Sequence, residues 1–132
     1  MTADADWLSS APLPDHALAR IAGYIADELP REAVGLLVEQ PGTFAEVIPL
    51  TNISEDPEHS YQVEVAEIKR AFASHGGRDI LTAISEGCSL TLWHSHPSGQ
   101  VGPSRGDMRE RLEGLQYMVI AVTEAGLQAT LF

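Results

Sequence analysis

One stretch of the sequence decides the fold: LTLWHSHPSGQVGPSRGD, which covers residues 90–107. Its first four residues, Leu-Thr-Leu-Trp, predict a buried strand that leads directly into His94. Gly, Pro and Ser then dominate, as is typical of a loop, and Pro103 precedes a predicted helix over 104–115. A strand, a loop and a helix are therefore expected to follow one another here.

Helices and further strands are expected on both sides of this stretch. Apolar residues at helical spacing predict a helix from Asp15 to Leu29, which Pro30 ends. The other expected elements are strands at 33–38, 44–50 and 61–63, a helix from Val65 that ends at Gly76-Gly77, and a hairpin of 117–123 and 127–132. Residues 78–88 suit a helix or a strand equally. The pattern predicts an α/β (α+β) domain over 14–132, a mixed β-sheet flanked by helices, after a flexible arm at 1–13.

The composition excludes several classes of protein. At 132 residues and 44% hydrophobic content, the chain has room for one core. Nineteen acids against eight bases give a net charge of -11, which repels phosphate backbones and argues against nucleic acid as a partner. The acidic N-terminus is not a secretory signal, and no apolar run approaches membrane-spanning length, so we expect a cytoplasmic protein without a membrane partner. Cys88 is the only cysteine, so an internal disulfide is impossible.

Three residues of the deciding stretch predict a metal site. His94 and His96 are two residues apart at a strand end, so their imidazoles point to the same side. Ser104-x-x-Asp107 has the spacing of a helix start, which places Asp107 in the first turn, within reach of the imidazoles. Three protein ligands leave a fourth tetrahedral position for water, which is the arrangement of a catalytic zinc ion rather than of a structural one.

Hydrolysis at such a site needs a general base, and Glu32, at the mouth of the first apolar strand, is the best candidate. Ser104 is the candidate donor to the oxyanion of a tetrahedral intermediate. Each feature also has a structural explanation: His-x-His occurs in ordinary strands, Ser104-x-x-Asp107 is a common capping box, and Glu32 alone suits a solvated acid. The other histidines, at 16, 59 and 75, are expected at the surface.

Together, these five positions resemble the JAMM motif of the JAB/MPN (Mov34/MPN/PAD-1) zinc metalloproteases. The motif consists of an upstream Glu, then His-x-His, seven residues, Ser, two residues and Asp, and all of it occurs here. The segment PREAVGLL at 30–37 is similar to the Glu-bearing strand of the family, and the resemblance extends over 14–132. The short chain is most similar to the compact prokaryotic members.

The resemblance implies one zinc ion bound by His94, His96 and Asp107, with Glu32 as acid and base and Ser104 at the scissile carbonyl. It also implies a fold related to that of cytidine deaminases. The implied function is a metallopeptidase or isopeptidase that hydrolyses an amide bond. Its substrate is expected to be a protein or peptide: the C-terminal tail of a ubiquitin-like or sulfur-carrier protein, or a phage-tail-type substrate. The segment from Asn52 to Tyr61 is similar in both prokaryotic groups and does not separate them.

Two other functions compete with this one. Some MPN-type domains act as non-catalytic scaffold or assembly modules, although these usually lack the ligands that this chain retains. A zinc deaminase is suggested by the fold relationship, but that chemistry uses His-x-Glu and Pro-Cys-x-x-Cys, which do not occur here. The complete five-residue pattern therefore favours the peptidase.

Overall fold

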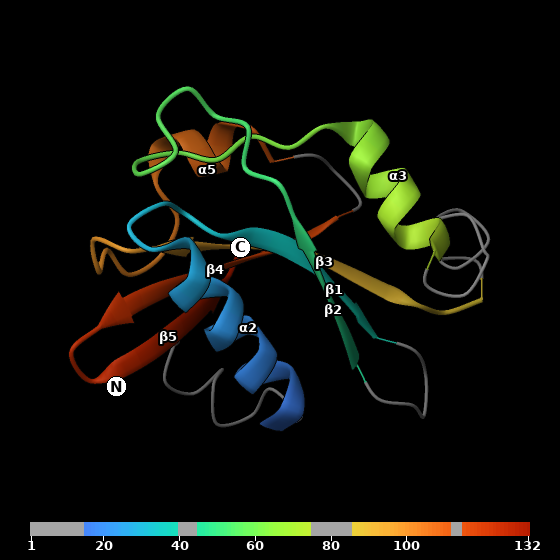
Figure 1. Cartoon of the computed structure of the whole chain (residues 1–132), viewed down its shortest axis with the longest axis horizontal. Helices are drawn as coiled ribbons and strands as arrows, with labels where there is room; N and C mark the ends of the chain where they lie inside the picture. The colour runs from blue at the N-terminus through green and yellow to red at the C-terminus, as the bar shows by residue number, and fades with distance from the viewer. Residues whose placement is uncertain (1–14, 40–44, 75–85, 112–114) are drawn as a thin grey trace.

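A computed structural model of the chain describes residues 15–39, 45–74, 86–111 and 115–132. Its strands form one sheet in the order β2-β1-β3-β4-β5 (Figure 1). Neighbouring strands are antiparallel except β3 and β4, which are parallel, so the expected mixed sheet is confirmed. The elements are α2 (Asp15–Glu28), β1 (Val34–Glu39), β2 (Ala45–Leu50), α3 (Val65–Ser74), β3 (Ser89–His96), α5 (Arg105–Arg109), β4 (Gln116–Thr123) and β5 (Gly126–Leu131).

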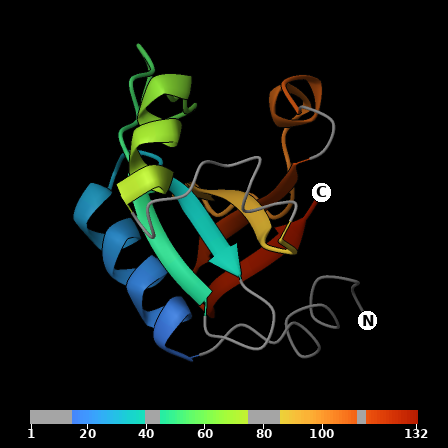
Figure 2. The same cartoon turned by 90° about the vertical axis from the view of Figure 1, so that its right-hand side faces the viewer.

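The sheet lies between two apolar layers. On one face, Ile21 and Ile25 of α2 pack with Trp93 and Met118. On the other face, Ile68 of α3 packs against a cluster that contains residues of β1, β2 and β3. Figure 1 shows α2 and α3 on opposite sides of the strands, and Figure 2 shows α2 running alongside β1 and β2. Because both faces are covered, β1 and β3 are almost continuously buried.

β3 is the central strand, and its side chains alternate between the two layers. Trp93 belongs to the cluster under α2, whereas Leu90 and Leu92 belong to the cluster on the α3 side. With this period of two, Ser95 points toward α2, and His94 and His96 point toward the α3 side. The two histidines end the strand and are 0% and 5% exposed. The predicted common direction of the two imidazoles is therefore confirmed.

β1 approaches β3 closely at Gly35, which pairs with Trp93 on one side and with Pro49 on the other. A Cβ atom added at Gly35 would lie 2.5 Å from Cζ2 of Trp93 and 2.6 Å from the carbonyl oxygen of Ile48. Only glycine fits here without displacing a neighbouring strand.

Two expected elements were wrong. Residues 61–63 do not form a strand; the Ile53 amide donates to the Gln62 carbonyl at 2.8 Å, but no ladder continues from it. The helix expected over 104–115 consists of only the five residues of α5. A capping box starts this helix as predicted, but none of its residues is buried, so no apolar face extends it. Residues 112–114 lie outside the described residues.

Other boundaries agree with the sequence or lie outside what is described. β3 continues to His96, two residues past His94, so both histidines belong to the strand. The arm at 1–13, the Pro41-Gly42 turn, the Gly76-Gly77 helix end and most of the ambiguous segment 78–88 fall outside the described residues, and so does His75. In the described ranges, every helix is too short or too polar to cross a membrane.

Candidate active site

Three atoms that could donate an electron pair to a metal ion, here called the donor atoms, lie together at the carboxyl end of β3. The Nε2 atoms of His94 and His96 lie 3.3 Å apart, and Oδ2 of Asp107 lies 3.2 Å from each of them. The three side chains are at most 11% exposed. The strand supplies the two imidazoles and the first turn of α5 supplies the carboxylate, as the spacing predicts.

The capping box of α5 orients the carboxylate of Asp107. The Ser104 amide donates to Oδ2 at 2.8 Å, and the Asp107 amide donates to the Ser104 hydroxyl at 3.1 Å. The same carboxylate oxygen therefore caps the helix and faces the histidines. The two explanations of the Ser-x-x-Asp spacing, structural and functional, are compatible.

The imidazole of His96 is oriented by a backbone group. Its Nδ1 atom lies 3.1 Å from the Gln100 carbonyl, to which it donates, so the Nε2 atom of the neutral ring presents a lone pair to the site. Histidines that bind metals usually donate their second ring N–H in this way. Nothing in the sequence distinguishes this carbonyl from others in the loop.

The donor triangle fits a tetrahedral divalent ion. A tetrahedral ion bound at about 2.0 Å separates its donor atoms by about 3.3 Å, because the edge of a tetrahedron is about 1.6 times the centre-to-corner distance. The observed separations are 3.2, 3.2 and 3.3 Å. Two imidazoles and one carboxylate are also ligands that zinc accepts. The residues present therefore suit such an ion in both chemistry and spacing.

Glu32 lies beside this triangle. The β1–β3 register pairs Val34 with His94, and its continuation by two residues places Glu32 opposite His96 on the same face. Donor atoms of Glu32, His94 and His96 all lie within 4.8 Å of one another. Glu32 is 4% exposed, and this burial raises the pKa of its carboxyl to about 7 although the neighbouring His96 lowers it. A carboxyl with this pKa can accept and return a proton near neutral pH.

The titration of the three donor residues follows from burial and hydrogen bonding. Burial lowers the pKa of His94. In His96 burial also lowers the pKa, but hydrogen bonds to Asp107 and to the Gln100 carbonyl outweigh it and raise the pKa overall. Burial raises the pKa of Asp107, but hydrogen bonds from both histidines hold it well below its usual range. Asp107 is therefore a carboxylate throughout the physiological range.

Ser95, between the two histidines, ties β3 to the residue after Glu32. Its hydroxyl accepts a hydrogen bond from the Ala33 amide at 2.8 Å, and its own amide donates to the Ala33 carbonyl at 2.9 Å. Ser95 is completely buried. This contact holds the start of β1 in register with the end of β3, so it links the candidate base to the candidate ligands.

Two aromatic rings pack against His94, in addition to its contact with Asp107. The Tyr61 ring stacks on it with centroids 4.3 Å apart and an interplanar angle of 29°, and Phe132 approaches edge-on at 6.2 Å. The buried Nδ1 atom of His94 has no hydrogen-bond partner among the described residues. Stacking therefore replaces the second-nitrogen hydrogen bond that orients His96.

The site opens into a cleft of about 450 Å³. Ser54 and residues 58–62 line one side, and the other side is formed by His96, the loop after it and α5. Ser104 lines the cleft together with Glu32, while no Lys or Arg of the described ranges lines it. Four of the five residues selected from the sequence therefore line the cleft, and the fifth, His94, lies behind its surface.

Two contributors have no clear signal in the sequence: the Gln100 carbonyl and the Ser95 hydroxyl each hold a site residue in place. Tyr61 belongs to the segment that the family resemblance singled out, but its stacking on His94 was not predicted. His59 is exposed as expected, and Cys88 is in the core.

Comparison with known proteins gives three findings. The family described as prokaryotic homologs of the JAB domain matches residues 14–131. A protein of Thermus thermophilus, named a probable TtuB-protein conjugate cleaving protease, is 29% identical over 109 residues, which are 81% of this chain and 67% of that protein. The solution structure of protein DSY2949 from Desulfitobacterium hafniense is similar with a TM-score of 0.57 at 21% identity, over 88% of this chain and 86% of the other. This structural similarity shows that the two proteins share a fold.

Proposed function

Because this chain belongs to the family of prokaryotic homologs of the JAB domain, we propose that it is a zinc-dependent metallopeptidase or isopeptidase. It hydrolyses an amide bond in a protein or peptide substrate. The observation that carries the proposal is the triangle of His94, His96 and Asp107 donor atoms with the Glu32 carboxylate beside it. Zinc, when bound by these three residues, supplies a Lewis acid that activates water at neutral pH.

The chain's own groups supply the proton transfers. Glu32 takes a proton from the attacking water and returns it to the leaving amine, which its buried position between sheet and cleft allows. The Ser104 hydroxyl already accepts the Asp107 amide, so its own hydrogen is available to the oxyanion of the scissile carbonyl.

The substrate class is proposed to be the C-terminal tail of a ubiquitin-like or sulfur-carrier protein joined to another group by an amide bond. The name of the Thermus thermophilus relative describes cleavage of a protein conjugate, which supports this class over a phage-tail-type substrate. The alternative is a scaffold module without turnover. The intact donor set and base favour catalysis over this alternative.

The test uses three proteins: wild type, Glu32→Gln and His96→Ala. Elemental analysis is expected to find about one zinc ion per chain in the first two and none in His96→Ala. The probe is a ubiquitin-like protein with an amide-linked fluorophore at its C-terminal tail. Loss of the base is expected to reduce cleavage by about 10² to 10⁴-fold at unchanged zinc content. A zinc-loaded Glu32→Gln as active as the wild type contradicts the role of Glu32, and a wild type without zinc contradicts the site.

A further inference from the structure

Both backbone polar groups of Glu32 bond to the loop between β2 and α3. The Glu32 amide donates to the Pro57 carbonyl at 2.7 Å, and the Glu32 carbonyl accepts from Nδ2 of Asn52 at 3.0 Å. The β1 ladder begins only at Val34. The hydrogen bonds of the Glu32 backbone itself are therefore made with this loop, whereas the next residue, Ala33, bonds to Ser95 of β3.

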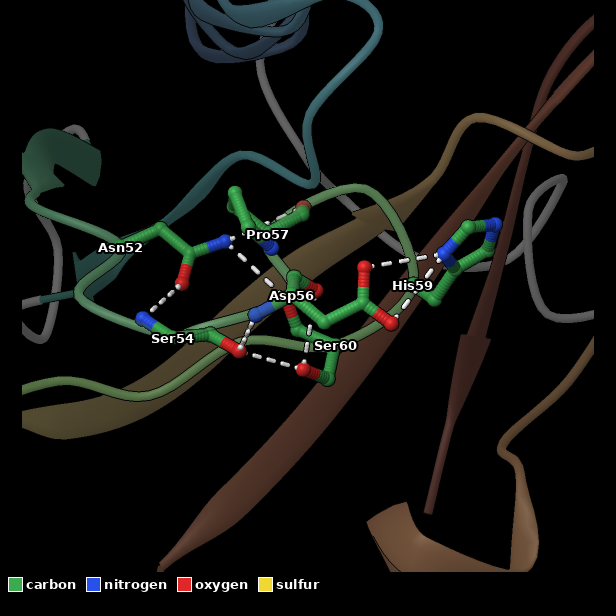
Figure 3. Close-up of polar contacts among 6 residues, drawn as sticks. All are labelled: Asn52, Ser54, Asp56, Pro57, His59 and Ser60. Atoms are coloured by element: carbon green, nitrogen blue, oxygen red, sulfur yellow. Dashed lines mark hydrogen bonds and ion pairs between the residues drawn. The ribbon is translucent and has the colours of Figure 1, made fainter.

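The Asn52 side chain organises this loop, as Figure 3 shows. Besides the Glu32 carbonyl, its Nδ2 atom donates to the carbonyls of Ser60 at 3.1 Å and Pro57 at 3.4 Å. Its Oδ1 atom accepts from the amides of Ser54 at 3.0 Å and Gln62 at 3.2 Å. The two hydrogens on Nδ2 are thus shared among three carbonyls, and Oδ1 accepts hydrogen bonds from two backbone amides. A primary amide at this position is the one group that fits both sets.

The loop that Asn52 organises also forms a wall of the cleft. Residues 58–62 line it, and Tyr61 stacks on the ring of His94. The Asn52 side chain thus connects the backbone of Glu32 to the segment whose Tyr61 ring covers His94. Asn52 itself does not line the cleft.

We propose that Asn52 is a positioning residue, which clamps the backbone of Glu32 to the 52–62 loop and so sets where the Glu32 carboxylate lies relative to the histidines. The inference rests on the proposed function, in which Glu32 is the base. A displacement of about 1 Å at a catalytic group reduces turnover by about 100-fold. Loss of the clamp is therefore expected to lower kcat far more than it changes KM or zinc content.

The test compares Asn52→Asp with a matched control, Thr51→Val. Aspartate keeps the acceptor oxygen for both loop amides and loses the donors to the three carbonyls. Valine at 51 removes a hydroxyl that bonds to Glu67 at 2.8 Å, away from the cleft. Three readouts are measured on each zinc-loaded protein: zinc content, kcat and KM on the fluorophore-tail probe, and the exchange rate of the Glu32 amide hydrogen by NMR.

For Asn52→Asp we expect kcat to fall 10- to 100-fold, with KM and zinc content within twofold of wild type, and the Glu32 amide to exchange at least tenfold faster. Thr51→Val is expected to match the wild type throughout. A purely structural role of Asn52 predicts a lower Tm with a normal kcat in the folded fraction. Normal kcat and normal exchange in Asn52→Asp overturn the proposal.

Two further outcomes keep the inference separate from the proposed function. If the wild type binds zinc but does not cleave the probe, the proposed function fails, and the Glu32 exchange rate alone decides on the clamp. If Asn52→Asp does not fold, Asn52→Gln retains the amide on a longer side chain and takes its place. An intermediate kcat with accelerated Glu32 exchange then supports the clamp, and a lowered Tm with full kcat refutes it.

Discussion

Replacement of Gly35 by alanine tests the packing of the sheet beneath the site. The added Cβ atom would lie 2.5 Å from the Trp93 ring and 2.6 Å from the Ile48 carbonyl oxygen, whereas ordinary contacts are 3.4–4 Å. The backbone of β1 must therefore move by about 1 Å, because one of the obstacles is itself backbone. Overpacking of this kind costs about 1 to 3 kcal/mol. We expect the upper end of that range, a fall in Tm of about 10 °C for a chain of this size.

The assay is urea denaturation followed by circular dichroism and tryptophan fluorescence. Gly23→Ala is the matched control, because this residue lies within α2 and its added Cβ meets no atom within 4 Å. Alanine in a helix interior is more stable than glycine by about 0.5 to 1 kcal/mol. The free energy of unfolding should therefore rise in Gly23→Ala and fall in Gly35→Ala. A Gly35→Ala protein within about 0.5 kcal/mol of the wild type would refute the reasoning, since an overpacked core is expected to exceed that range.

Three further predictions concern single contacts. Ser95→Ala leaves the buried Ala33 amide without its acceptor and should lower the free energy of unfolding by about 1 to 3 kcal/mol in urea titrations. Tyr61→Leu should weaken zinc binding by about tenfold in a chelator competition, and Tyr61→Phe, which keeps the stacked ring, should not. The Asp56 hydrogen bond raises the pKa of His59, so NMR should find it above 6.5 and Asp56→Asn should lower it. The stabilising contribution of this exposed pair is present below pH 6.5 and is lost as the pH rises through the raised pKa.

The parts of the site that depend on local periodicity could be predicted from the sequence. Two-residue alternation placed His94 and His96 on one side, and the capping-box spacing placed Asp107 in the first turn of a helix. The mixed sheet followed from the alternation of apolar runs with helical patterns. These features involve neighbours within a few residues, where backbone geometry alone decides direction.

The contacts that fix positions between distant segments could not be predicted. The length of α5 depends on whether its apolar residues find a partner, and Met108 stays 44% exposed. The position of Glu32 opposite His96 depends on the register between β1 and β3, which are far apart in the sequence and are not joined by a turn that would fix it. The role of Asn52 depends on loop closure, because its acceptors are carbonyls separated from it by up to 20 residues. Backbone amide and carbonyl groups are nearly the same in every residue, so contacts with them leave no pattern in the sequence and are seen only in the structure.

The three donor atoms belong to elements that differ greatly in local stability. Two belong to the central strand, whose amides are expected to open to solvent only when most of the sheet unfolds. The third belongs to a five-residue helix without a buried residue, and such a segment opens at a small fraction of that free energy. Asp107 is therefore expected to leave the donor triangle more readily than either histidine. Metal exchange should then be much faster than global unfolding, and the apoprotein should reload without refolding.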